Sequence, residues 1–499
     1  MGRGTWAPRP DAEASAPGRV AVAGRVVYHR ANGIASPFPM NKERFMIAKV
    51  IDRLEREKSR AVDELVDLLR IPSVSADPAH KGDLRKAAEW LAGRLRAAGV
   101  KAEILETPGH PIVYGERLDA KGAPTVLIYG HYDVQPPDPL DEWTSPPFEP
   151  VIKDGKIYAR GSSDDKGQLL THVHAIAAWL AENGSLPINV KIILEGEEEI
   201  SSVNLPKFLE ANREKLKCDV VVVSDTSQFA PGIPAITYGL KGLSYFEIRV
   251  QGPSADLHSG SFGGSVANPV NVLAKLIGDL HDAKGRVAIP GFYDDVKELE
   301  EWERKEYASL PFDEKDYMRI TGVPALWGEE GFTTTERRWA RPTLDVNGIW
   351  GGYQGEGGKT IIPARAGAKI SMRLVPNQDP EKIAKLFEAH VRKVAPPTVK
   401  LEVIPMHGGM PFFLDPKSPV FEKAALAIEK GFGKKPVFIR EGGSIPITQT
   451  FKDVLGADTL LLGWGQHDDR AHSPNERFDL GDYHRGTLSS AHLIGLLGK

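Results

Sequence analysis

The sequence predicts an α/β protein with a mainly parallel sheet flanked by helices, interrupted by an inserted α+β domain. Three observations predict this fold. From Pro124 onwards, short apolar runs alternate with amphipathic segments, as buried parallel strands crossed by helices do. After Gly242 the next strand alternates its side chains, which is typical of a half-exposed antiparallel strand. The apolar style returns at TLLLGWG (459–465), so the first domain is predicted to be discontinuous.

The first part of the discontinuous domain is expected over residues 45–240. Residues 1–44 mix Gly, Pro, Ala and Arg and are predicted to form a disordered tail, with a transit peptide or a later translation start as alternatives. The first 39 residues lack the apolar core of a secretory signal, so a cytoplasmic location is expected. Apolar residues at three- and four-residue spacing predict a helix over 47–69.

The elements of the predicted parallel layer follow in order. Apolar runs at 125–130, 189–196 and 219–225 are the expected strands, and a helix begins near 168 between the first two. The second part of this domain, 406–499, is expected to add a helix near 418–431, the strand at 459–465 and a closing helix from about 482.

The insert is expected over residues 241–405 with a small sheet of its own. The strand LSYFEIRVQG begins it, and a helix follows Pro269. The segments 366–376, 381–394 and 399–406 then indicate strand, helix and strand. The insert therefore has a predicted β-α-β and β-α-β order.

Composition excludes several classes of protein. The chain has 63 basic and 67 acidic residues, and the resulting net charge of −4 argues against a nucleic-acid platform or a polybasic membrane surface. No stretch approaches the ~20 apolar residues of a membrane helix. The single cysteine, Cys218, excludes an intramolecular disulfide and cysteine-rich zinc sites. Any metal must therefore bind His, Asp and Glu.

Histidines and acids follow the predicted strands where parallel strands finish. His131 and Asp133 stand two residues apart after the strand at 125–130, and this spacing turns both side chains to one face. Asp225 ends another apolar run, and His472 comes after the late strand. Ligands of open α/β sheets bind at the carboxyl ends of strands. A turn aspartate beside a hydrogen-bonded histidine would also explain the first pair.

Two carboxylate clusters lie between these positions. Asp164 and Asp165 precede the predicted helix, and Glu197, Glu198 and Glu199 follow the second strand. Adjacent carboxylates repel one another unless a cation or a helix N-terminus is near. Helix capping would explain one aspartate, and a solvated loop would explain the glutamates. Taken one at a time, these motifs are weak evidence.

Together the motifs indicate a centre of two divalent cations. Two histidines and at least three carboxylates are expected at the same end of four strands. Two divalent ions carry four positive charges, which three carboxylates and one bridging hydroxide would neutralise. A single structural zinc would need no fifth ligand, so the surplus of ligands favours catalysis.

The sequence resembles the di-metal aminopeptidase and carboxypeptidase family (family 20) that includes carnosinase, cytosolic non-specific dipeptidases, carboxypeptidase G, aminoacylase and succinyl-diaminopimelate desuccinylase. The resemblance runs from about residue 45 to the end. The motifs GHYDVQP, DDKG, LEGEEEISS, ITYGLKG, DLHSG, REGGSIP and AHSPNE are most similar to the carnosinase and dipeptidase branch. The resemblance implies a catalytic domain that holds two metal ions, an insert that serves as lid and dimerisation domain, and a homodimer.

The resemblance also implies which residues bind the metals. It assigns five ligands to two ions, with His131 and Asp225 on one, Glu199 and His472 on the other, and Asp164 between them. Asp164 is implied rather than Asp165 because one variable residue and then Lys-Gly follow the ligand in the family. Zinc, manganese or cobalt would suit such ligands.

The same comparison implies the catalytic groups. Glu198 matches the general acid/base, and Asp133 would hold the ligand His131 in orientation. This chain has three consecutive glutamates where relatives have two. Aligning Glu195-Gly196 with the Glu-Gly that precedes the pair selects Glu198 and Glu199.

Four further residues match substrate contacts of the family. His258 corresponds to a histidine that reaches the active site of a neighbouring subunit and polarises the substrate carbonyl. Arg373 resembles an arginine that binds a substrate carboxylate, and His407 and Ser444 match other contact positions. The helix histidines at 172 and 174 match no ligand and are expected to be structural.

The resemblance therefore implies a dipeptidase that cleaves dipeptides with a free carboxyl terminus, using a water activated by two metals. An N-acyl-amino-acid deacylase with the same metal centre is the nearest alternative, and the motifs do not separate the two. A non-catalytic binding relative is a third reading. It predicts missing ligands, whereas all five ligand positions and the base are filled.

Overall fold

The structure, a computed structural model, describes residues 42–443 and 445–499. Most of the expected tail therefore lies outside the described residues. The helix predicted over 47–69 is two helices, α1 (Lys42–Arg56) and α2 (Lys58–Leu69). Glu57 separates them with a non-helical backbone, φ −96° and ψ 10°. The apolar spacing continues across this break, so the pattern alone did not reveal it.

A nine-stranded sheet contains four central parallel strands, as predicted. Its order is β1-β2-β6-β3-β7-β17-β8-β15, with β16 also paired to β8. The neighbours β6, β3, β7 and β17 are parallel, whereas β1, β2, β8 and β15 add antiparallel pairs at the flanks. The strands are β1 (Lys101–Leu105), β2 (Ile112–Arg117), β3 (Thr125–His131), β6 (Asn189–Glu195), β7 (Val220–Val223), β8 (Ala235–Leu240), β15 (Phe412–Phe413), β16 (Val437–Glu441) and β17 (Asp458–Gly463).

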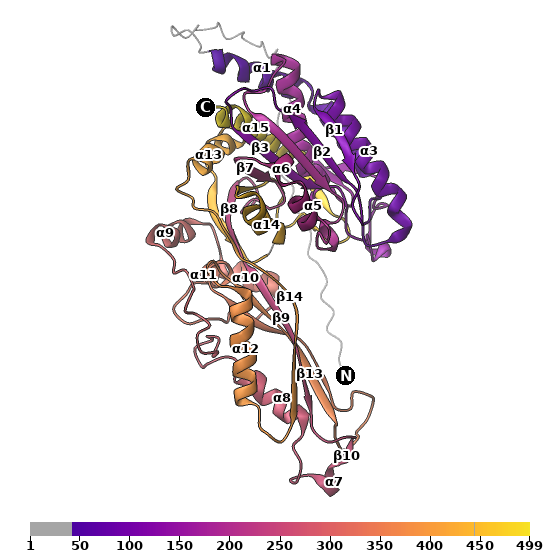
Figure 1. Cartoon of the computed structure of the whole chain (residues 1–499), viewed down its shortest axis with the longest axis vertical. Coiled ribbons are helices and arrows are strands. Elements are labelled where there is room, and N and C mark those ends of the chain that lie inside the picture. Colours follow the sequence, from indigo (N-terminus) through magenta and orange to yellow (C-terminus); the bar gives the residue numbers. More distant parts are fainter. Residues whose placement is uncertain (1–41, 444) are drawn as a thin grey trace, which may run out of the picture. The chain divides into compact units, whose positions relative to one another are not determined.

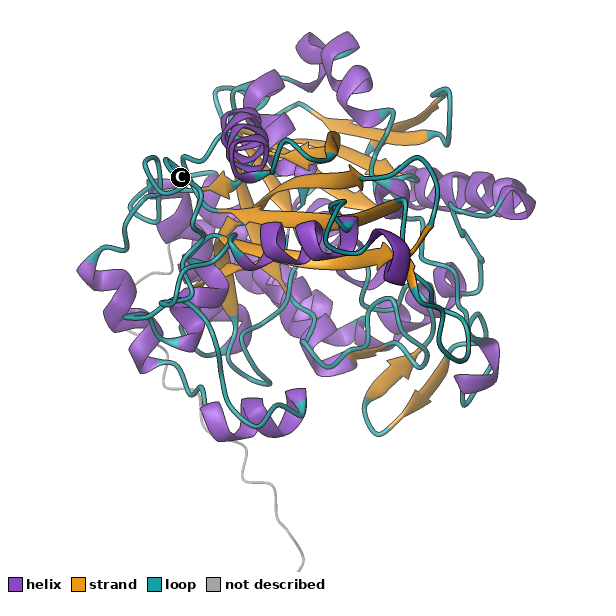
Figure 2. Cartoon of the chain, turned by 90° about the horizontal axis from the view of Figure 1, so that it is seen from below, coloured by secondary structure: helices purple, strands orange, loops and turns teal. Residues whose placement is uncertain are grey.

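Helices cover the sheet because its central strands are apolar on both faces. Every residue of β3 and β6 after the first is buried, and β7 is four buried valines. Figure 2 shows helices around this sheet, and α3, α4 and α14 contact its strands directly. The helices are α3 (Lys81–Ala97), α4 (Lys166–Asn183), α5 (Leu205–Ala211), α6 (Arg213–Leu216), α13 (Pro419–Phe432), α14 (Pro446–Leu455) and α15 (Leu480–Leu497).

The insert has a separate four-stranded antiparallel sheet in the order β11-β13-β9-β14. Two helices pack on it, and Figure 1 shows α12 and α8 alongside its strands. The elements are β9 (Gly242–Gln251), α8 (Pro269–Gly278), β11 (Thr343–Gly351), β13 (Arg365–Leu374), α12 (Pro380–Val394) and β14 (Lys400–Gly409). This order agrees with the predicted β-α-β and β-α-β arrangement, although the strand β11 itself was not predicted.

Buried residues alternate with half-buried or exposed ones along β9, as its sequence predicts. The buried side includes Phe246 and Ile248, which belong to a hydrophobic core with Ile370 and Phe387. Three further helices, α9 (Glu301–Ser309), α10 (Glu314–Thr321) and α11 (Thr334–Trp339), were not predicted. The division of the chain at residues 241 and 405 stays a prediction.

Short elements complete the fold near the motifs. A three-stranded sheet joins β18 (Arg477–Asp479), β5 (Lys156–Tyr158) and β4 (Val151–Lys153), and a two-stranded ribbon joins β10 (Leu257–His258) to β12 (Ile361–Ile362). The short helix α7 spans Ser259–Phe262. The 3₁₀ turns are η1 (Pro78–His80), η2 (Leu140–Glu142) and η3 (Glu198–Ile200).

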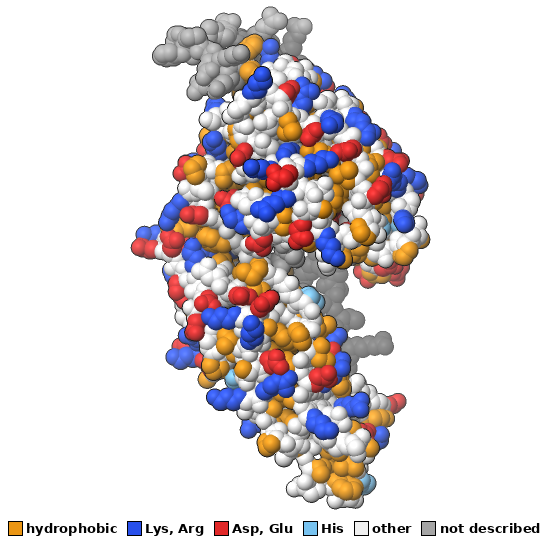
Figure 3. Space-filling model, in the orientation of Figure 1, with side chains coloured by type: hydrophobic (Ala, Val, Ile, Leu, Met, Phe, Trp, Pro, Cys, Tyr) orange, Lys and Arg blue, Asp and Glu red, His pale blue; other side chains and the backbone are white. Residues whose placement is uncertain are grey.

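The surface carries charges of both signs. On the face drawn in Figure 3, basic and acidic side chains are interspersed, in keeping with the net charge of −4. Across residues 42–443 and 445–499, every helix is too short or too polar to span a membrane.

Candidate metal centre

The predicted ligands lie at the carboxyl ends of four adjacent parallel strands. His131 is the last residue of β3, and Asp225 comes two residues after β7. Glu199 lies in η3, which begins three residues after the end of β6, and His472 lies in the loop that follows β17. Asp164 comes from the loop before α4. Parallel pairing of these strands therefore brings distant segments of the sequence to one edge.

Two groups of side chains there could each hold a metal ion, and they share Asp164. One group contains His131, Asp164 and Asp225, and the other contains Asp164, Glu199 and His472. In each group the ligand atoms lie within 4.8 Å of one another. Asp164 Oδ1 is 3.0 Å from His131 Nε2, and its Oδ2 is 3.0 Å from His472 Nε2. This grouping is the one that the resemblance implies, and the metal-binding roles stay predictions.

The donor set fits divalent ions of the zinc and manganese type. Each group combines one imidazole with two carboxylates, which are the nitrogen and oxygen donors that such metals accept. His131 is fully buried, and the carboxylates of Glu199, Asp225 and Asp164 are largely buried. Burial and the neighbouring Asp164 raise the pKa of Asp225 well above its usual range, so these three acids are all charged only when positive charge lies beside them.

Asp133 orients both His131 and the glutamate turn. Its carboxylate Oδ1 lies 3.3 Å from His131 Nδ1, and its backbone oxygen lies 3.1 Å from the same nitrogen. Its two carboxylate oxygens also accept the backbone N–H groups of Glu198 and Glu199, at 3.2 and 3.1 Å. A proton on Nδ1 of His131 leaves Nε2 free to bind a metal.

The three consecutive glutamates have different surroundings. Glu197 accepts the backbone N–H of His110 at 3.0 Å and both of its oxygens accept from Asn204, so its side chain anchors the loop. Glu199 belongs to one of the candidate metal groups. Glu198 lies between them, partly buried and outside both groups. The structure thus gives the extra glutamate a structural contact.

The electrostatics reflect this concentration of acids. Hydrogen bonds to Asp164 and Glu199 raise the pKa of His472 to about 10. Burial disfavours a charged His131, but contacts with Asp133 and Asp164 outweigh burial and raise its pKa well above the usual range. Burial raises the pKa of Glu198 to about 7. The nearby His131 acts to lower this pKa, and the charge of Glu199 acts to raise it. Cations binding here would therefore compete with protons for the histidines.

Helix capping does not account for the paired aspartates. Within the described residues, Asp165 at the N-terminal cap position of α4 makes no side-chain capping bond. Its Oδ2 instead accepts the backbone N–H of His131 at 3.1 Å. Asp165 thus supports the end of β3 that carries His131, while Asp164 lies close to both histidines.

Two residues that contact the candidate ligands were not singled out from the sequence. Gln135 Nε2 donates to Glu199 Oε2 at 2.9 Å, which holds that carboxylate in place. Glu476 accepts the backbone N–H of Asp164 at 3.1 Å. Gln135 lies in the motif GHYDVQP and Glu476 in AHSPNE, but neither stands at a spacing from a histidine or a second acid that would indicate a functional role.

Two predicted substrate residues lie in the sheet of the insert. Arg373 on β13 pairs with Leu243 at the start of β9, and β14 pairs Gly409 with the same residue. His407 on β14 packs edge-on against Tyr245 with ring centroids 5.1 Å apart, and both line an open groove of about 530 Å³. Ser444 lies outside the described residues.

His258 lies on the ribbon strand β10, outside both metal groups. Its Nδ1 accepts backbone N–H groups from Gly260 and Ser261 at 3.0 and 3.3 Å. Nε2 therefore carries the ring proton in the neutral imidazole, and the residue is exposed. The described contacts of this chain do not bring His258 to the candidate ligands.

The family model for peptidase family M20/M25/M40 matches residues 127–495. The chain belongs to this family. The Cys-Gly metallodipeptidase of Schizosaccharomyces pombe is 36% identical over 454 residues, which cover 88% of this chain and 95% of that protein. The human Beta-Ala-His dipeptidase is 31% identical over 460 residues, 89% of this chain and 91% of that protein.

Solved structures agree with this assignment to family M20. The M20 metallo-carboxypeptidase of Sulfolobus solfataricus has a TM-score of 0.77 and 38% identity, over 88% of this chain and 99% of that one. Human carnosine dipeptidase has a TM-score of 0.74 and 31% identity, over 91% and 99%. These comparisons confirm the predicted α/β fold and the resemblance to metallopeptidases.

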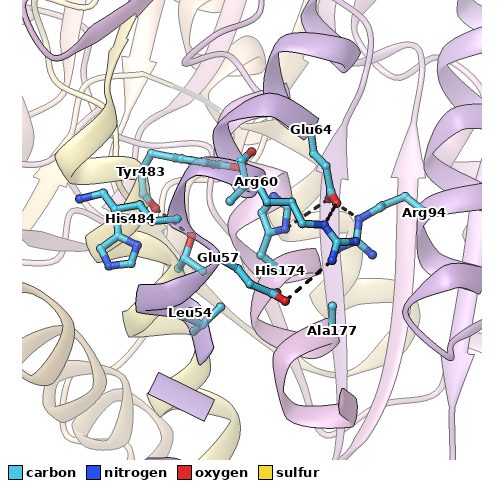
Figure 4. A pocket seen from close by; sticks show the side chains of 12 residues that line it. Leu54, Glu57, Arg60, Glu64, Arg94, His174, Ala177, Tyr483 and His484 are labelled. Carbon is cyan, nitrogen blue, oxygen red and sulfur yellow. Dashed lines mark hydrogen bonds and ion pairs between the residues drawn. The ribbon is translucent and has the colours of Figure 1, made fainter. Parts of the chain in front are cut away.

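A cavity of about 20 Å³, much smaller than the groove beside His407, lies between α1, α2, α3, α4 and α15 (Figure 4). Glu64 in its wall pairs with Arg60, Arg94 and His174. The cavity has room for about one water, so it does not suit a peptide substrate. His172, on the same helix as His174, is hydrogen-bonded to the hydroxyls of Ser224 and Ser490, and His174 contacts Glu64, so the contacts of both histidines agree with the expected structural role.

Proposed function

We propose that this M20 peptidase is a metal-dependent dipeptidase that hydrolyses dipeptides with a free carboxyl terminus. The observation that carries the proposal is the position of Asp164, which contacts a histidine of each candidate metal group at 3.0 Å. Relatives named as metallodipeptidases, which align over most of the chain, support the reaction class.

The proposed centre holds two divalent ions, zinc or manganese, with cobalt also suitable. Asp164 would be shared, with His131 and Asp225 on one side and Glu199 and His472 on the other. When bound, two such ions polarise a water and the scissile carbonyl. Asp133 keeps Nδ1 of His131 engaged, so that Nε2 is available to the ion.

Glu198 is the proposed general acid/base. Asp133 accepts its backbone N–H. Glu198 immediately precedes the proposed ligand Glu199 in the turn η3. From there the carboxylate would take a proton from the attacking water and give it to the departing amine. Arg373 would bind the carboxylate of the substrate, and His407 and Ser444 would contact the rest of it.

A homodimer is part of the proposal because His258 would serve the site of a partner subunit. Its exposed Nε2–H could donate to the substrate carbonyl as negative charge develops on the oxygen. The expected cytoplasmic location stays a prediction.

The cross-subunit role predicts complementation between inactive variants. Glu198→Ala and His258→Ala subunits, each inactive alone, are co-expressed with different tags and the hybrid dimer is purified. One of its two sites then has both residues intact, so about half of the wild-type activity per dimer should return. Verified hybrids that stay inactive would contradict the role of His258 across the dimer.

Substrate class is tested with a panel of compounds that share the same amino acids. Dipeptides, dipeptide amides, acetyl- and succinyl-amino acids and longer peptides are compared by amine release, with zinc or manganese added. We expect dipeptides to have the highest kcat/KM and the amides to be poor substrates. Preferred cleavage of acyl-amino acids would instead support the deacylase alternative, and preferred trimming of long peptides would support a carboxypeptidase.

A further inference from the structure

A fully buried carboxylate, Glu476, binds the loop that carries Asp164. Its Oε2 accepts from Arg160 Nη1 and from the backbone N–H of Gly161, both at 2.8 Å. Its Oε1 accepts the backbone N–H groups of Ser163 at 2.9 Å and Asp164 at 3.1 Å. One side chain thus satisfies four donors, and three of them are amides of a four-residue segment.

The backbone N–H groups of this segment depend on Glu476 because the segment belongs to no helix or strand. It lies between the end of β5 and the start of α4, and its backbone is irregular. Buried backbone N–H groups need acceptors, and a carboxylate is a stronger acceptor than a neutral oxygen. The position of Asp164 is therefore set by a side chain from a remote part of the sequence.

Glu476 lies in the same segment as His472, one of the two histidines that Asp164 contacts. His472 lies four residues before it, and β18 begins one residue after it. The backbone oxygen of Glu476 accepts from Ala159 N at 3.1 Å, and β18 pairs with β5. A second link runs from Ser163 Oγ to Asp469 Oδ2 at 3.2 Å. These hydrogen bonds and the pairing of β18 with β5 therefore connect the loop of Asp164 to the loop of His472.

We propose that Glu476 is a positioning residue that fixes Asp164 relative to His472, so that both groups can hold an ion together. This inference rests on the proposed two-ion centre. It gives Glu476 no contact with substrate or metal. Its effect is transmitted through the amides of Ser163 and Asp164 and through the short chain to His472.

The test is Glu476→Gln, measured by zinc binding to the metal-free protein. A carboxamide has one accepting oxygen, so its NH₂ group would face two of the four donors. We expect zinc affinity, from competition with a chromogenic chelator, to fall by roughly 10- to 100-fold for at least one of two ions. Wild-type protein that binds two zinc ions but cleaves no dipeptide would refute the proposed function and leave this comparison valid.

Glu303→Gln is the matched control. Glu303 is also buried, pairs with the buried Arg440, and accepts from Tyr238 OH at 2.7 Å. None of these partners belongs to a candidate metal group. Both substitutions break a buried carboxylate–arginine pair, so both should lower the melting temperature of the metal-free protein. Only Glu476→Gln should weaken zinc binding. Equal melting losses with wild-type zinc affinity in both variants would reduce Glu476 to a structural role and overturn the proposal.

Should Glu476→Gln not fold, Glu476→Asp is measured in the same assay. Aspartate keeps the charge beside Arg160, but its shorter side chain does not reach all four donors. We expect zinc affinity to fall about three- to tenfold. Affinity within about twofold of wild type would overturn the proposal.

Discussion

Replacement of Asp164 by asparagine is expected to leave the protein folded but unable to retain two metal ions. Asp164 is the residue shared by both candidate groups, with one oxygen toward each histidine. At an effective dielectric constant of 20, a unit charge about 4 Å away contributes roughly 4 kcal/mol per unit of cation charge. Loss of that charge should reduce affinity by on the order of 10³-fold or more per ion, and turnover with it.

Metal content after zinc loading and gel filtration measures this effect, with amine release as the activity readout. Asp165→Asn is the matched control, since Asp165 is adjacent and buried but contacts the backbone N–H of His131 instead. The control should keep two ions. If Asp164→Asn also keeps both at wild-type affinity, Asp164 does not bridge them. If Asp165→Asn loses them instead, the register of the aspartate pair is wrong.

The parallel core was predictable because burial on both faces leaves a strong pattern. The runs VLIYG and VVVV lie in β3 and β7, within one or two residues of the predicted bounds. The edge strand β1 (KAEIL) was missed because only one of its five residues is buried. The helices α9 and α10 were missed because they have little buried surface to impose an apolar stripe, and α11 was missed because most of its buried residues are polar.

The sequence predicted that the site lies at the ends of parallel strands. It did not by itself predict which of two adjacent acids is the ligand. His131 and Asp225 follow apolar runs, so topology alone brings them together. Asp164 was selected over Asp165 from the resemblance, because the position of the pair before the predicted helix does not distinguish the two aspartates. Glu476 was missed because its partners are backbone amides, and backbone amides are the same at every non-proline position of a sequence.

Substitution of Glu198 by glutamine is expected to preserve both metal ions and to lower turnover by roughly 10²–10⁴-fold. Glu198 lies outside both candidate metal groups, so its charge is not needed as a ligand. A carboxamide has nearly the same shape, but it neither takes a proton from water nor delivers one to an amine. Metal analysis and kcat for a dipeptide, measured on the same preparation, separate loss of the base from loss of the metals.

Glu197→Gln is the matched control for this prediction, because Glu197 is the adjacent glutamate and is bound to His110 and Asn204. It removes one charged acceptor from the loop, which should cost stability by about 1–3 kcal/mol while turnover changes only a few-fold. A large loss of turnover in Glu197→Gln, with Glu198→Gln active and fully loaded with metal, would move the catalytic base by one residue. Such a result would also require a different register for the three glutamates, since Glu199 would then follow the base by two positions.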